Sequence, residues 1–404
     1  MAIAVSFNRK LPRLASIPPI ILLTFLLVID IIVLWLFWSP TNTDLTDYAL
    51  KWYIFLRQHG FAALGTDFSN YTPPYLYLLG LGTLADGLVA PATIIRGLSV
   101  AFNGLAAVLV FHVVRSWGRP RGHALLAACL FFLLPELLVN SAVWGQCDII
   151  YTLFLIACVH FAIERRGWAA MAMLGVALAF KAQATFIAPF ILYLLLSRQV
   201  RWRQLVAVPL VCGALMVPAA LAGRPWRELL TIYLGQADYF QSLTMWAPNP
   251  YLVVRALLPD SPQVVGIGTA IGLLLGVATV IALALIFLRL EGGPRRERLL
   301  LMATLSLAAM PYVLPRMHER YFLPAGAMAF LLAVESPAAW PVAAMIQAAD
   351  LAAYTGFLLA KHTHVLLALA AIVMTAAIVS LIALLLERRA AGDAALAPAA
   401  RSSA

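Results

Sequence analysis

The chain has 404 residues, of which 63% are hydrophobic and 11% charged. An ordinary soluble domain is about 45–50% apolar and about 25% charged. This composition excludes a water-soluble enzyme of this size, because so few charges cannot cover a globular surface, and it excludes a disordered chain. The chain has 28 Lys and Arg residues against 18 Asp and Glu, a formal net charge of +10. We attribute this excess to membrane topology rather than to nucleic-acid binding, because no basic run is interleaved with aromatic residues.

Apolar segments long enough to cross a membrane follow one another along the chain. The first comes after Arg9, Lys10 and Arg13 and is too long for the apolar part of a signal peptide, so we interpret it as a transmembrane helix. Spanning a bilayer takes about 20 apolar residues in a helix whose backbone satisfies its own hydrogen bonds. The expected segments are 18–38, 93–114, 123–142, 149–164, 168–182, 183–197, 204–222, 263–288, 298–313, 323–339, 341–359 and 365–386.

Lys and Arg gather in every second connector between these segments, as the positive-inside rule requires of cytoplasmic connectors. We therefore predict an all-α, multi-pass cell-membrane protein of about 12 transmembrane helices with both termini in the cytoplasm. Residues 1–388 are expected to form one transmembrane domain, and 389–404 a disordered cytoplasmic tail. The basic connectors are 9–13, 115–121, 165–166, 198–203, 289–298 and 388–389.

This charge pattern places all of residues 39–92 on the outer side, although part of the segment is apolar. Two helices are expected to lie in the outer interface there, at 44–59 and 74–87. Both are rich in Trp or Tyr, which suits headgroup depth, and Pro73 and Pro74 suit a helix start.

The first candidate site residues are Asp44 and Asp47, directly after the first span. Either could act as a general base at the membrane surface. The alternative is that a carboxylate here caps the helix N-terminus.

Two further polar clusters follow on the outer side, and both could bind a sugar or an acceptor. Tyr71 and Tyr75 could line a sugar pocket, or they could belong to an aromatic belt around a Pro-Pro turn. Trp144, Gln146 and Asp148 offer a stacking ring, an amide and a carboxylate within five residues, which suits hydroxyl recognition, although a loop turn would also explain them.

Lys181 and Asn249 are isolated candidates. Lys181 lies between two apolar runs, on the side where positive charge is disfavoured, so it could meet a phosphate; a lysine at a helix end can also snorkel to the interface. Asn249 belongs to a long outer loop at 223–262, where it could bind substrate or form a Pro/Asn turn.

The strongest signal is the cluster at 315–322. Arg316, His318 and Arg320 lie on the expected outer side of the membrane, where the positive-inside rule disfavours positive charge. A phosphate is a natural partner for them, because the arginine guanidinium matches the geometry of phosphate oxygens. A helix-end salt bridge with Glu319 is the alternative. Glu319 and Tyr321 are candidates for binding sugar or acceptor.

Together these residues could transfer a sugar from a lipid phosphate. Arg316, His318, Arg320 and Lys181 would neutralise the departing polyprenyl phosphate, while Asp44 takes the proton of the acceptor hydroxyl. This chemistry needs no nucleotide, metal or other cofactor, and the sequence has neither a DxD pair nor a Gly-rich nucleotide loop.

The order of these residues resembles the GT-C class of integral membrane glycosyltransferases. The closest likeness is to bacterial mannosyltransferases related to the second mannosyltransferase of GPI-anchor assembly, the PIG-V type, over about residues 18–325. The residues that carry the resemblance are Asp44, NYTPPY at 70–75, WGQCD at 144–148, Lys181 and MHERY at 317–321.

This resemblance implies a GT-C-like bundle with two juxtamembrane helices in the first outer loop. It implies a catalytic Asp that maps onto Asp44, with Asp47 a less good match, and places Arg316, His318, Glu319 and Arg320 near the donor phosphate. It also implies a polyprenyl-phosphate-linked donor sugar, commonly mannose, and an inverting displacement. The acceptor stays open between lipid, glycan and protein. Compared with the family's pattern, the outer loop at 223–262 is modest and no C-terminal soluble domain is expected, and such parts often shape the choice of acceptor.

Two other functions remain as alternatives, a transporter or flippase of lipid-linked sugar and a non-catalytic partner subunit. A transporter would show charges along its spans and two similar halves, and the sequence shows no such halves. The glycosyltransferase hypothesis requires Asp44 and the cluster around His318 to share one external cavity.

Overall fold

The computed structural model describes Val28 and residues 42–237, 242–259, 261–290, 293–358 and 364–396. Within these residues almost every element is a helix; the exceptions are two strands of two residues each. The chain divides into two compact units. Unit 1 consists of Met1–Leu153 and Pro218–Arg224, and unit 2 of Phe154–Val217 and Pro225–Ala404.

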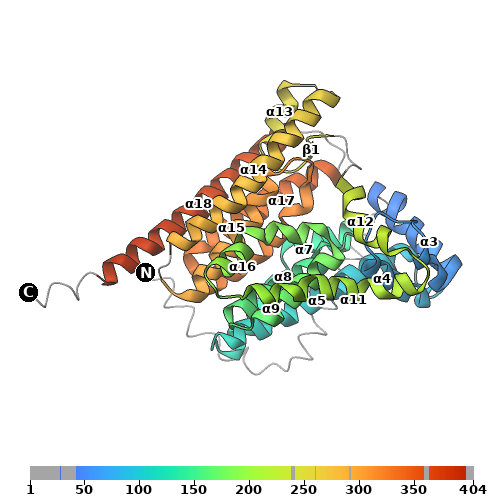
Figure 1. Cartoon of the computed structure of the whole chain (residues 1–404), viewed down its shortest axis with the longest axis horizontal. Coiled ribbons are helices and arrows are strands. Elements are labelled where there is room, and N and C mark those ends of the chain that lie inside the picture. Colours follow the sequence, from blue (N-terminus) through green and yellow to red (C-terminus); the bar gives the residue numbers. More distant parts are fainter. Residues whose placement is uncertain are drawn as a thin grey trace, which may run out of the picture. The chain divides into compact units, whose positions relative to one another are not determined.

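Unit 1 begins with the two helices expected at 44–59 and 74–87. The first is a π-helical turn, η2, continued by α3, and the second is α4, with Pro73 in its first turn, followed by η4. Figure 1 shows α3 and α4 next to each other, and both pack against α5. The elements are η2 (Leu45–Ala49), α3 (Leu50–His59), η3 (Gly60–Gly65), α4 (Pro73–Gly82), η4 (Thr83–Ala85), α5 (Pro91–Ser116), α6 (Arg121–Phe132), α7 (Pro135–Leu138) and η5 (Val139–Trp144).

Unit 2 is built around a bundle of long helices. The helices α14 to α18 pack against one another in sequence, and α15 also packs against α18 (Figure 1). The remaining elements include the strands β1 (Thr244–Met245) and β2 (Met317–His318), which pair in parallel. The helices are α8 (Asp148–Ile163, which begins in unit 1), α9 (Gly167–Phe180), η6 (Ala182–Ile187), α10 (Ala188–Leu196), η7 (Trp202–Val206), α11 (Ala207–Leu221, which ends in unit 1), α12 (Trp226–Ala237), α13 (Tyr251–Leu257), α14 (Pro262–Arg289), α15 (Arg295–Val313), η8 (Glu319–Phe322), α16 (Leu323–Glu335), η9 (Pro337–Ala339), α17 (Trp340–Leu358) and α18 (His364–Leu396).

Every apolar segment expected after residue 92 is helical in the structure. Among the described residues, four helices are long and apolar enough to cross a membrane, or five if α6 with α7–η5, bent by 46°, is one span. The expected count of about 12 spans is therefore not confirmed, because helices such as α8, α9 and α10 are 9–16 residues long, and about 20 residues are needed to span a bilayer. The first expected span, 18–38, lies outside the described residues except for Val28.

The short return segment of unit 1 is fixed by polar contacts. Arg224 is 3% exposed, and its guanidinium donates to the carboxylate of Asp67. The Tyr77 hydroxyl accepts from the backbone N–H of Ala219 at 3.1 Å. Burial raises the pKa of Tyr77 to about 12, so this hydroxyl stays protonated at neutral pH. A buried cation with an acidic partner thus anchors the end of α11 to the loop before α4.

We expect Asp67→Ala to lower the free energy of unfolding by about 1–2 kcal/mol, because a buried guanidinium would lose its carboxylate partner. Asp47→Ala is the control, since Asp47 and Lys51 form an exposed pair at 3.5 Å that contributes about 0.5 kcal/mol or less. Thermal or denaturant unfolding of the purified protein in detergent measures both. Equal effects of the two substitutions would contradict the anchoring role of Asp67.

Candidate functional site

Asp44 is held by two side chains that lie about one hundred positions away in the sequence. Its Oδ2 accepts from the Gln146 amide at 2.8 Å and from the Trp144 indole N–H at 3.2 Å. Trp144 is 1% exposed and Gln146 8%, whereas Asp44 is half-buried. The carboxylate is therefore oriented by rigid, buried donors while its own residue still reaches the surface.

Asp44 does not act as a helix cap. The capping contact comes from Asn42, whose side-chain oxygen accepts from the N–H of Leu45 at 2.9 Å. The amide of the same Asn42 donates to the carbonyl of Trp144 at 2.8 Å. Asn42 thus joins the start of η2 to the Trp144 segment, a role that its sequence position did not indicate.

The Trp144–Gly145–Gln146 turn is fixed by the end of η5. Gly145 has φ +82°, and the N–H of Gln146 donates to the carbonyl of Asn140 at 2.9 Å. A Cβ on Gly145 would lie 3.3 Å from Cγ of Arg96 and 3.5 Å from Cδ1 of Leu45. Gly145 is therefore required both by its backbone angle and by the close approach of two neighbouring side chains.

Arg96 on α5 is a residue of this region that the sequence prediction missed. It is 1% exposed and its aliphatic stem lies beside Gly145. The one available signal was a cation inside an otherwise apolar expected span, which is costly in a membrane and often functional.

A second buried carboxylate, Asp148, lies at the start of α8. It is fully buried, and its Oδ2 accepts from the Asn140 amide at 3.1 Å. Tyr75 lies near Asp148: burial, followed by the proximity of Cys147, Tyr71 and Asp148, raises the pKa of Tyr75 well above its usual value. The Tyr75 hydroxyl therefore stays protonated and can donate a hydrogen bond.

A row of aromatic rings leads from η2 to Tyr75. Ring centroids are 6.0 Å apart for Tyr48 and Trp52, 5.0 Å for Trp52 and Tyr71, and 5.1 Å for Tyr71 and Tyr75. Tyr48 and Tyr71 are half-buried, while Trp52 and Tyr75 are buried. Five residues singled out in the sequence thus have partners in unit 1. Tyr71 contacts Tyr75, Asp148 lies near Tyr75, and Trp144 and Gln146 donate to Asp44.

Asp47 lies apart from these contacts. Its side chain is 56% exposed and pairs with Lys51 at 3.5 Å. The two candidate bases thus have different surroundings, and only Asp44 is oriented by buried donors.

In unit 2, two cationic side chains and one histidine lie beside the ring of Tyr321. Lys181 Nζ and Arg320 Cζ each lie 5.9 Å from its centroid, and the His318 ring meets it edge-on at 5.2 Å. Lys181 is 8% exposed, His318 6% and Arg320 8%. Lys181 therefore does not snorkel to the surface, and residues far apart in sequence form one buried group, which we call the Tyr321 cluster.

Glu319 supplies the negative charge of the Tyr321 cluster. It is fully buried, with Oε1 3.0 Å from Arg320 Nη1 and 3.8 Å from His318 Nδ1. The salt bridge considered from the sequence is thus present. The cluster contains this one carboxylate and two permanent cations, Lys181 and Arg320, so it keeps an excess of positive charge that suits an anion.

Backbone pairing fixes the segment that carries His318. Met317 and His318 in β2 pair with Thr244 and Met245 in β1, and Trp246, at φ +65°, forms a further bridge to His318. The loop at 242–249 therefore fixes the backbone position of His318 in the Tyr321 cluster.

Arg316 and Asn249 have different surroundings. Arg316, at φ +60°, donates from its backbone N–H to Leu243 at 2.7 Å and from Nε to Thr269 of α14 at 3.2 Å. Asn249 is buried, with its oxygen accepting from the N–H of Tyr251 at 3.2 Å and its amide donating to Pro311. These contacts match the turn expected as the alternative for Asn249.

The family model of glycosyltransferase family 87 matches residues 70–315, more than half of the chain. The chain belongs to glycosyltransferase family 87. This is a GT-C-type family, so the protein is a glycosyltransferase with membrane-type helices. None of the curated proteins compared with the chain matches it.

The range matched by glycosyltransferase family 87 contains Tyr71, Trp144, Gln146 and Lys181 but neither Asp44 nor the segment after 315. The case for Asp44 and for the cluster residues 318–321 therefore rests on their geometry and not on the family match. The narrower likeness to the PIG-V-type mannosyltransferases stays a prediction.

We expect Gly145→Ala to destabilise unit 1 more than Gly118→Ala does. Both glycines have positive φ, so each alanine adds about 1 kcal/mol of backbone strain. Only the alanine at 145 also meets Arg96 and Leu45, whereas a Cβ on Gly118 has open space within 4 Å. Melting temperatures in detergent compare the two variants, and a Gly118→Ala protein that melts as low as Gly145→Ala would count against the close packing.

Proposed function

We propose that this protein transfers a monosaccharide, mannose in the first instance, from a polyprenyl-phosphate donor to a hydroxyl of a lipid, glycan or protein acceptor. The reaction is a direct displacement with inversion at the outer face of the cell membrane. Membership of glycosyltransferase family 87 supports sugar transfer in general. The mannose preference rests on the PIG-V-type resemblance, and the outer face, cytoplasmic termini and about 12 spans rest on the charge pattern of the connectors.

The observation that carries the proposal is the oriented carboxylate of Asp44. The acceptor oxygen attacks the anomeric carbon, its proton passes to Asp44, and the bond from that carbon to the phosphate oxygen breaks. Two donors on Oδ2, from Trp144 and Gln146, set the direction of the carboxylate. A base positioned in this way lowers the barrier when the proton moves in the transition state. Asp47 is the second candidate, and its exposure supports it less.

The Tyr321 cluster suits the departing polyprenyl phosphate. Negative charge grows on the bridging oxygen as the bond to the sugar breaks, and preorganised cations stabilise that charge most in a water-poor site. Lys181, His318 and Arg320 are each at most 8% exposed. Arg316 could assist from the same segment, although its guanidinium bonds to Thr269.

The remaining candidates suit the sugar and acceptor. Hydroxyl groups pair with buried amides and carboxylates such as Gln146, Asp148 and Glu319, and aromatic rings such as Tyr71, Tyr75, Trp144 and Tyr321 offer faces to the sugar. The contacts of Asn249 support a role in shaping its loop and do not add support for substrate binding. A carboxylate base and a cationic phosphate site supply this chemistry without a metal ion or a nucleotide.

We expect Asp44→Asn to reduce transfer by roughly 10³-fold, within the range of general-base contributions. Asn keeps the size and can still accept hydrogen bonds, so the fold should persist. Asp47→Asn is the matched control and should retain activity within about threefold of the wild type, because the exposed carboxylate of Asp47 pairs with Lys51 and is less suited than Asp44 to take the acceptor proton. Mass spectrometry of products from purified protein with polyprenyl-phosphate mannose, glucose and arabinose donors measures both variants and identifies the sugar.

Wild-type turnover by Asp44→Asn would remove Asp44 as the base. The reverse pattern, with only Asp47→Asn inactive, would assign the base to Asp47. Movement of intact lipid-linked sugar across vesicles, with no transfer by any form of the protein, would favour the transporter, and inactivity on every donor without such movement would favour the partner subunit.

We expect Lys181→Gln to raise the KM for the donor by roughly 10- to 100-fold, as for the loss of one charge-assisted contact to phosphate. Arg316→Gln should raise it less, because Arg316 bonds to Thr269 of α14. Initial rates at varied donor concentration give both values. A donor KM unchanged in Lys181→Gln would refute the phosphate role of the Tyr321 cluster.

A further inference from the structure

Unit 2 carries an exposed group of arginines and tryptophans at the ends of four helices. We propose that this group is a binding site for the headgroups of anionic phospholipids. Its members, which we call the Arg–Trp patch, come from the α8–α9 and α10–η7 connectors and the first turns of α9 and η7. They are Arg165, Arg166, Trp168, Arg198, Arg201, Trp202 and Arg203.

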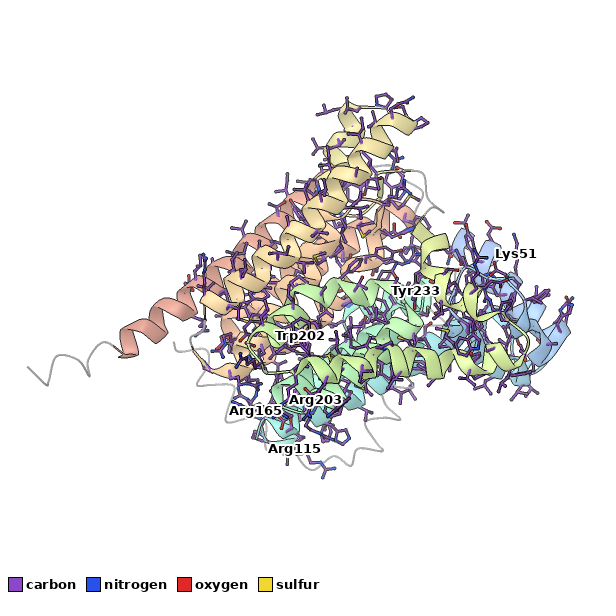
Figure 2. All side chains as sticks on the ribbon, viewed as in Figure 1. Lys51, Arg115, Arg165, Trp202, Arg203 and Tyr233 are labelled. Carbon is purple, nitrogen blue, oxygen red and sulfur yellow. The ribbon has the colours of Figure 1, made fainter. Side chains whose placement is uncertain are left out.

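The two connectors lie side by side. The first turn of α9 packs against η7, and Gly167 is so close to the side chain of Gln204 that an added Cβ would collide with it. Gln204 in turn accepts from the backbone N–H of Arg201 at 2.8 Å. Figure 2 shows Arg165, Trp202 and Arg203 at one end of unit 2. Basic residues from separate parts of the sequence therefore form one surface.

The backbone under the patch is held in place. Arg165 and Arg198 both have φ +58° at the ends of α8 and α10, and the residues after them close these ends with hydrogen bonds from Arg166 to Phe161 and from Val200 to Leu194. The guanidinium of Arg295 donates to Ala162 at 3.0 Å and to Gln199 at 2.8 Å, which ties one connector to the other. Neighbouring backbone and Arg295 already satisfy these helix ends, so the exposed guanidinium groups are not needed to close them. The guanidinium of Arg166 stacks over the Phe161 ring at 4.8 Å, a contact that uses its face and leaves its N–H groups for an anion.

The patch has a large excess of positive charge. Its five arginines face one acid in the same two connectors, Glu164, which gives 5 − 1 = +4. All five are exposed, and none is in an ion pair with any residue that the structure describes. Charge complementarity therefore favours an anionic partner.

The position of the patch selects a lipid rather than a soluble anion. Trp202 and Arg203 open the segment Trp202–Leu221, which is long and apolar enough to cross a membrane and of which only 17% is buried. Leu210 is 65% exposed further along it, while Trp202 at its start is 61% exposed and Trp168 beside it 50%. Residues at the first turn of such a helix lie at headgroup depth, where Trp and Arg contact the glycerol and phosphate of lipids.

The test uses the full-length protein in neutral detergent, with native mass spectrometry to count bound phosphatidylglycerol and phosphatidylcholine during titration. The wild type should prefer phosphatidylglycerol. Arg166→Gln/Arg203→Gln should weaken phosphatidylglycerol binding roughly 10- to 30-fold, at about one interaction per arginine, and leave phosphatidylcholine binding unchanged. Lys51→Gln/Arg227→Gln is the matched control, because it also removes two exposed cations, both outside the patch, and should bind as the wild type does.

A second variant guards against misfolding. Arg198→Gly removes one charge where φ +58° favours glycine, so it should keep or raise the melting temperature while weakening phosphatidylglycerol binding roughly fivefold. The proposal is overturned if the wild type shows no preference for phosphatidylglycerol, or if the patch variants bind it as well as the control does. It is also overturned if glycerol phosphate without acyl chains competes at equal concentration, since the site would then bind soluble anions. None of these readouts depends on sugar transfer.

Discussion

The carboxylate of Asp44 is held by the Trp144 indole and the Gln146 amide, and our account of the candidate site in unit 1 depends on this contact. A carboxylate accepts hydrogen bonds in many directions, so two donors from a buried turn are needed to set one orientation. That turn requires a positive-φ glycine at 145. The π-helical segment before it is held to α5 by Asn103, which donates to Ser141 at 2.6 Å. A substitution of Gly145 or Asn103 would therefore alter the orientation of the Asp44 carboxylate through the Trp144–Gln146 turn.

In unit 2, cationic side chains lie close together in a buried environment of low dielectric constant. Lys181 and Arg320 carry like charges, and burial raises the free-energy cost of each charge. Glu319 offsets part of this cost by pairing with Arg320, and Lys181 and Arg320 each lie over the Tyr321 ring. The remaining excess charge is what a bound phosphate would neutralise.

The sequence predicted the helices well because hydropathy and proline position are local signals. The two helices between 44 and 87, for example, follow from amphipathic composition and from Pro73. The count of about 12 spans is not confirmed, because some apolar segments are short helices with 3₁₀ extensions, as at η6 and α10. Polar motifs singled out Asp44, Trp144, Gln146 and the residues of the Tyr321 cluster as candidates, and the structure shows which contacts each of them makes. Local sequence could not separate Asp44 from Asp47, or reveal Asn42 and Arg96, because contacts across about 50–100 positions decide these roles.

A structure of the protein with a bound polyprenyl-phosphate sugar, determined by cryo-electron microscopy in a lipid nanodisc, tests the central claim most directly. The account predicts the phosphate within hydrogen-bond distance of Lys181 and Arg320, and Asp44 facing the side of the anomeric carbon opposite the phosphate. A phosphate bound elsewhere, or an anomeric carbon that an acceptor oxygen held by Asp44 cannot approach, would contradict it.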